Sequence, residues 1–151
     1  MKKSVVAVFL LVLFAGCSSV ALTGRKQLLL VSDSEVMSLS NSSFRDYMKT
    51  AKPSANAANT EMVVRVGKKI AGAVETYLRN NGMADEVRNF AWEFHLVQDP
   101  EPNAFCMPGG KSVVNEGILP YTRTEEGLAI VLGHEVGHAV AKHSAERLSQ
   151  Q

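Results

Sequence analysis

The segment LGHEVGHAVAKH, residues 132–143, constrains the fold most, because a helix would bring its first two histidines together. His134 and His138 are four residues apart, which places them about 40° apart around a helix and roughly 6 Å along it. Both imidazole rings can then face one metal ion. Glu135 lies about 100° from His134 around the axis, beside the two histidines. The sequence therefore predicts a helix that carries a metal centre.

The residue types of this HExxH pattern favour zinc and hydrolysis. Zinc binds neutral imidazole nitrogens at about 2.0 to 2.1 Å and lowers the pKa of a bound water to about 7. A carboxylate beside the metal can act as general base on that water. We therefore expect one zinc ion per chain, held by His134 and His138, with Glu135 as the catalytic base of peptide hydrolysis. The alternative is a solvated helix that carries two histidines by chance.

A catalytic zinc ion normally has three protein ligands, and the segment offers only two in reach. His143 lies about 140° from His138 around a continuous helix. Glu146 lies about 18 Å along the axis from His134. Neither side chain can join the first two unless the helix breaks. The third ligand is therefore expected outside this segment.

Apolar residues at three- and four-residue spacing predict two helices ahead of this one. The first follows Ser32, which can cap a helix start, and ends before Pro53. The second begins at Thr60 and ends at Asn81-Gly82. Both are expected to be packing helices.

A strand and a hairpin are expected between these helices and the HExxH helix. Residues 90–96 alternate between large apolar side chains and smaller or polar ones, as in a half-buried strand. The sequence Pro-Gly-Gly at 108–110 predicts a turn between two antiparallel strands. A capping box, Thr122-x-x-Glu125, then predicts the start of the HExxH helix. The expected fold class is α+β, mainly helical, with a small antiparallel sheet beside the HExxH helix.

Composition limits the chain to one ordinary domain and excludes some partners. The chain has 151 residues, and its 16 basic side chains are balanced by 15 acidic ones. No basic face is therefore expected, and no nucleic acid as partner. If Cys17 carries a lipid, Cys106 has no disulfide partner, and it is expected to be buried rather than to act as a catalytic thiol.

The first 16 residues have the pattern of a signal peptide. Two lysines precede an apolar run of about ten residues, far shorter than the roughly 20 that a membrane-spanning helix needs. Phe-Ala-Gly-Cys at 14–17 resembles a bacterial lipoprotein box, in which cleavage leaves a lipid on the cysteine. We expect a signal peptide at 1–16, a lipidated Cys17 with a tether over 17–31, and one domain over 32–151. A plain secretory signal or an uncleaved anchor are the alternatives.

The sequence resembles the M48 family of zinc metallopeptidases, specifically its bacterial periplasmic lipoprotein members. The resemblance is carried by TGRKQLLLVSDSE, VGKKIA, PNAF, PGG, EGIL and GHEVGHAVAKHSAERLS. It implies a zincin-like domain in which His134 and His138 bind zinc and Glu135 is the catalytic base. The third zinc ligand would be a glutamate on a later helix, downstream of Gln151. Residues 32–151 would then be the N-terminal half of the peptidase domain.

The resemblance also implies a substrate class and a location. The protein would be an endopeptidase that cleaves misfolded or misassembled cell-envelope proteins, as protein quality control. Asn103, Ala104 and Phe105 would bind an extended substrate by strand addition. The lipid on Cys17, followed by serine, would place the protein on the periplasmic face of the outer membrane. The alternative is a weakly active or non-catalytic, chaperone-like lipoprotein, because the third ligand lies outside the chain; the oligomeric state is left open.

Overall fold

The structure of the chain is a computed structural model that describes residues 17–19, 26–28 and 31–149. The signal peptide predicted for residues 1–16 and the side chain of Cys17 lie outside the described part. The backbone of β1 (Cys17–Ser19) pairs antiparallel with β2 (Lys26–Leu28). Among the described residues, no helix combines the length and the apolar character needed to cross a bilayer.

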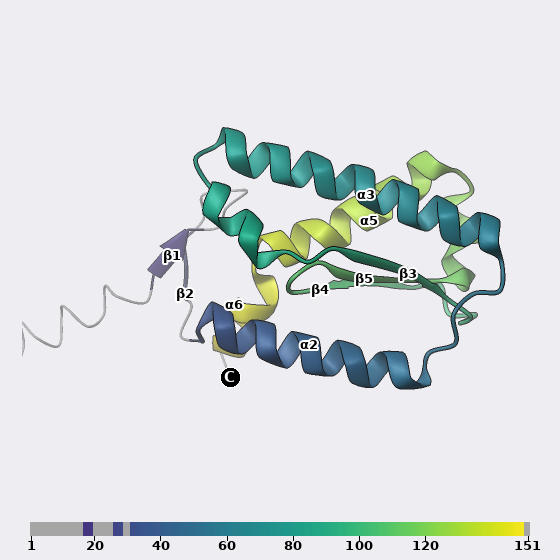
Figure 1. Cartoon of the computed structure of the whole chain (residues 1–151), viewed down its shortest axis with the longest axis horizontal. Helices are drawn as coiled ribbons and strands as arrows, with labels where there is room; N and C mark the ends of the chain where they lie inside the picture. Colours follow the sequence, from purple (N-terminus) through teal and green to yellow (C-terminus); the bar gives the residue numbers. More distant parts are fainter. Residues whose placement is uncertain (1–16, 20–25, 29–30, 150–151) are drawn as a thin grey trace, which may run out of the picture.

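The domain consists of a small sheet between helices (Figure 1). One face of the sheet is covered by α3 and α5, and the other face by α2. The remaining elements are short and connect these layers. In chain order the elements are α2 (Asp33–Thr50), α3 (Ala57–Asn80), η1 (Ala84–Asn89), β3 (Glu93–Val97), β4 (Ala104–Met107), β5 (Lys111–Asn115), η2 (Glu116–Ile118), α4 (Leu119–Thr122), α5 (Glu125–Val140) and α6 (His143–Ser149).

The sheet has the strand order β3-β5-β4. β4 and β5 form the predicted antiparallel hairpin, and both glycines of its turn have a φ of 87°. β3 pairs with β5 in parallel, so the sheet is mixed rather than wholly antiparallel as expected. β5 is the central strand, and Ser112 to Asn115, whose side chains alternate between the two covered faces of the sheet, are buried. The α+β class, mainly helical with a small sheet, is confirmed.

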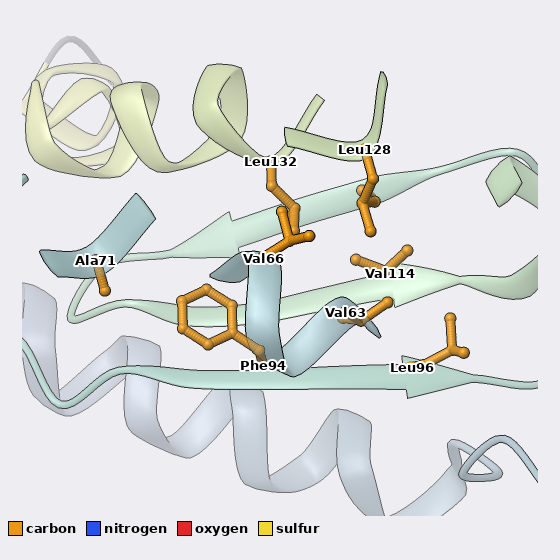
Figure 2. Packing of buried hydrophobic residues seen from close by; sticks show 9 residues of the cluster. Val63, Val66, Ala71, Phe94, Leu96, Val114, Leu128 and Leu132 are labelled. Carbon is orange, nitrogen blue, oxygen red and sulfur yellow. The ribbon is translucent and has the colours of Figure 1, made fainter. Parts of the chain in front are cut away.

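The main core lies between the sheet and the pair α3 and α5 (Figure 2). Leu128 and Leu132 of α5 point at the sheet beside Val66 of α3, and they meet Phe94 and Val114 from the strands. Both leucines are fully buried, and each such side chain stabilises the fold by roughly 1.5–3 kcal/mol. This burial fixes which side of α5 faces the core.

Two helices begin at other residues than the sequence predicts, whereas Ser32 caps α2 as expected. α3 begins before Thr60, because the side chain of Asn56 accepts the first hydrogen bond of that helix. Thr124 rather than Thr122 caps α5, because Thr122 belongs to the preceding short helix α4. Both shifts replace one plausible capping residue by another close to it in the sequence.

The packing of α3 on β3 can be tested with two glycines of the same helix. A Cβ added at Gly67 would overlap the ring of Phe94, whereas one added at Gly72 meets no atom within 4 Å. Gly67→Ala is therefore expected to lower the free energy of unfolding by about 1–3 kcal/mol. Gly72→Ala is expected to raise it by up to about 1 kcal/mol, the difference in helix propensity. Urea unfolding measures both, and equal changes in the two variants would contradict this packing.

Candidate metal centre

The side of α5 that faces away from the core is open. Leu132 and Val136 are fully buried, but Ile130 keeps 75% of its surface exposed. A Cβ added at Gly133 or Gly137 would meet no atom within 4 Å. The helix therefore presents a stretch of bare backbone beside its histidines, which leaves room for another group to approach closely.

The two histidines of the motif converge as the sequence predicts. His134 Nε2 lies 3.0 Å from His138 Nε2, and the two rings are nearly perpendicular, with centroids 4.4 Å apart. Two nitrogen ligands on a tetrahedral zinc ion stand about 3.3 Å apart, given zinc to nitrogen distances of about 2.0 to 2.1 Å. The observed separation is close to that value. His134 and His138 therefore fit two positions of a zinc site.

A third ligand is not found in the part of the chain that the structure describes, where no group of three His, Cys, Asp or Glu side chains could hold a metal ion. His143 approaches the site from the far side. Its Nδ1 lies 2.7 Å from Nδ1 of His138, the nitrogen that faces away from His134. The helix does break before His143, but the break brings this side chain to the outer nitrogen of His138 rather than to the metal position.

The break between α5 and α6 is held by Lys142. Its φ is 56°, in the left-handed region, and its N–H donates to the carbonyl of Ala139. Its ammonium group lies 2.8 Å from Asp33 at the start of α2 and 3.2 Å from Glu86 in η1. Burial opposes the charge, but these two carboxylates raise the pKa of Lys142 above its usual value. The turn that ends α5 is thus tied to two other elements by a charged side chain.

Glu135 is half-buried, and it lies near enough to Cys106 of β4 for its charge to act on that thiol. Burial raises the pKa of the Cys106 thiol on β4 to about 11, and the negative charge of Glu135 contributes to that shift. Cys106 is half-buried rather than fully buried as expected, but its thiol is neutral at physiological pH, unlike a catalytic nucleophile. Glu135 follows His134 directly in the chain and is within electrostatic reach of β4, a position in which a general base could act.

The three residues predicted to bind substrate lie along β4, which packs against α5. β4 is an edge strand, and among the described residues it pairs only with β5. Ala104 is buried on the α5 side of the sheet, and Phe105 contacts Tyr47 of α2 on the other side. Asn103 precedes the strand, and its carbonyl accepts from the N–H of Asn115. The outer backbone edge of β4 is the part that could pair with an extended peptide.

The environment of Cys106 predicts slow alkylation. Because its pKa is about 11 rather than near 9, its thiolate fraction at pH 8 is about 100-fold lower than in the unfolded chain. Iodoacetamide is therefore expected to modify Cys106 at least about 100-fold more slowly in the native protein than in urea, since burial adds to the effect. Mass spectrometry of the peptide that contains Cys106 measures this rate. Equal rates in the native and unfolded protein would contradict the burial of the thiol.

Comparison with known proteins identifies the family of this domain. The model of Peptidase family M48 matches residues 57–151. The mitochondrial metalloendopeptidase OMA1 of Schizosaccharomyces pombe is 54% identical over 69 residues, 46% of this chain and 19% of that protein. OMA1 of Saccharomyces cerevisiae is 28% identical over 156 residues, 94% of this chain and 44% of that protein. The beta-barrel assembly-enhancing protease of Escherichia coli is 33% identical over 60 residues, 40% of this chain and 12% of that protein.

The chain thus spans less than half the length of these curated relatives. The family match covers most of the described domain and includes α3, the sheet and the whole of α5 with its convergent histidines. The family expected from the sequence resemblance is confirmed, and the chain belongs to peptidase family M48.

Proposed function

We propose that this protein is a zinc-dependent endopeptidase in which His134 and His138 bind the metal through Nε2. The observation that carries the proposal is the 3.0 Å approach of these two nitrogens on a helix whose buried face is fixed, in a domain of a peptidase family. Bound zinc would supply a Lewis acid that polarises the peptide carbonyl and acidifies a water. A third ligand is proposed to come from residues outside the described part of the chain, as the expected glutamate downstream of Gln151 would.

The proposed roles of the remaining residues follow from their positions. Glu135 would accept a proton from the attacking water and deliver it to the leaving amine. An extended substrate would pair with the outer edge of β4, at Asn103 to Phe105, so that its backbone runs beside α5. Main-chain pairing of this kind is tolerant of sequence, which suits an enzyme that acts on unfolded segments.

We propose the cell envelope as the location and its misfolded or misassembled proteins as the substrates. The signal-peptide pattern and the lipoprotein box at Cys17 support a lipid anchor, on the periplasmic face of the outer membrane. The name of the Escherichia coli relative, a beta-barrel assembly-enhancing protease, supports a role in envelope quality control. The mitochondrial relatives support the activity but belong to another compartment.

A second candidate function is that of a chaperone-like binding protein with little catalysis. The observation that favours it is that the described residues supply two convergent ligands and no third. Such a protein would bind unfolded polypeptide through the edge of β4 without cleaving it. An assay that separates the two candidates has to measure both the cleavage and the binding of an unfolded protein.

The catalytic proposal predicts different outcomes for metal and base variants. In the natural gene product, Glu135→Gln is expected to keep one zinc per chain and to lose about 10²- to 10⁴-fold of its activity on an unfolded protein such as reduced casein. His134→Ala is expected to lose zinc and activity together. Glu61→Gln, the same change on the exposed surface of α3, is the matched control and should remain fully active.

Full activity of the Glu135→Gln variant would contradict the assignment of the base. A wild-type protein that binds zinc and casein but cleaves nothing would support the second candidate instead.

The lipid anchor is tested with the two cysteines of the chain. Cys17→Ser is expected to abolish incorporation of a labelled fatty acid in the bacterial host and to release the protein from the membrane fraction. Cys106→Ser should leave fatty-acid incorporation and membrane association unchanged, because the lipid is proposed to be on Cys17. Labelling of the Cys17→Ser variant, or no labelling of the wild type, would refute the anchor.

A further inference from the structure

We propose that His143 is a positioning residue for His138, whose Nδ1–H it accepts so that Nε2 is left free to bind the metal. This inference rests on the proposed zinc site. His143 lies at the start of α6, after the turn that ends α5. Its ring centroid is 4.9 Å from that of His138, and the two Nδ1 atoms are 2.7 Å apart.

The protons of His138 can be assigned from its two contacts. Its Nε2 faces His134 and its Nδ1 faces His143, at 3.0 and 2.7 Å. A neutral imidazole carries a single N–H, and a nitrogen that binds a metal must present its lone pair. With Nε2 on the metal, the proton of His138 is therefore on Nδ1. His143 Nδ1 must then accept, so the proton of His143 is on its own Nε2.

Hydrogen bonds that hold a metal-binding histidine in place are common, but the acceptor in this contact is unusual. Metal-binding histidines generally donate their second N–H to a carboxylate, a backbone carbonyl or water, which fixes the tautomer and the orientation of the ring. Here the acceptor is a second neutral imidazole. Such an acceptor holds the ring without adding negative charge beside the metal.

The fold brings His143 to this position through the break at Lys142. On a continuous helix His143 would lie about 140° away from His138. The left-handed φ of Lys142 redirects the chain, and its pairs with Asp33 and Glu86 hold that turn against α2 and η1. A left-handed residue other than glycine is unfavourable by itself, so these pairs support a conformation that the local sequence does not prefer.

A matched pair of substitutions tests the role of the acceptor atom. Asparagine branches at Cγ like histidine and places Oδ1 where Nδ1 lies, whereas leucine has the same branching and no acceptor. In the full chain, His143→Leu is expected to weaken zinc affinity about 10- to 100-fold, the usual effect of losing such a partner. His143→Asn is expected to remain within about threefold of wild type. Ser144→Ala, an exposed neighbour, is the control for changes at the start of α6.

Zinc affinity is measured by competition with a chromogenic chelator, and circular dichroism reports whether each variant is folded. Long-range ¹H–¹⁵N correlation spectra of the wild type report the tautomer of His138 directly, without any substitution. We expect a protonated Nδ1 in the zinc-loaded protein, and a response of Nε2 rather than Nδ1 to the metal. For His143, Nδ1 should be unprotonated and unaffected by direct metal binding.

Three results would overturn the inference. One is a protonated Nε2 on His138 in the zinc-loaded wild type, and another is equal zinc affinity of the folded His143→Leu variant and the wild type. The third is an Asn variant as weak as the Leu variant. Failure of the proposed function gives a different result, in which the wild type binds no zinc or His138→Ala binds it unchanged.

Discussion

The burial of one face of α5 is the constraint on which the candidate site depends. Leu128, Leu132 and Val136 are fully buried, so the helix has only one rotation about its axis in which its apolar side chains leave water. That rotation determines where the other side chains point. His134 is exposed, whereas Glu135 is half-buried and lies near Cys106 of β4. The side chains of the HExxH motif are thus positioned by buried apolar residues of α5 that take no part in the proposed chemistry.

A second constraint acts at the C-terminal end of the same helix. His138 lies in the last turn of α5, where an unsupported helix would fray. The turn at Lys142 ends the helix there, and its ion pairs connect the site to α2 and η1. Because Lys142 is charged and half-buried, its two acidic partners are needed to keep that charge compensated. The position of His138 therefore depends on α2 and η1, which are far from it in the sequence.

Local chemistry explains which features could be predicted from the sequence. The helix after Ser32, the turn at 108–110 and the convergence of His134 and His138 depend on spacing or on one or two residues, and the structure contains all three. The parallel pairing of β3 with β5 could not be predicted, because it joins strands that are separated in the sequence by β4 and is not encoded by a local turn. The break in α5 also escapes prediction, since it involves neither glycine nor proline. The spacing predicts a position away from the two ligands for His143, because it assumes a continuous helix. The structure places His143 against His138.

The central claim is that His134 and His138 together bind zinc, and X-ray absorption spectroscopy at the zinc edge tests it most directly. The zinc-loaded protein is expected to show imidazole scattering from two histidines, with nitrogen neighbours at about 2.0 to 2.1 Å. In a variant with alanine at both positions, that imidazole signal should be absent. A first shell that contains only oxygen, or a sulfur neighbour from a cysteine, would contradict the assignment of the metal to this helix.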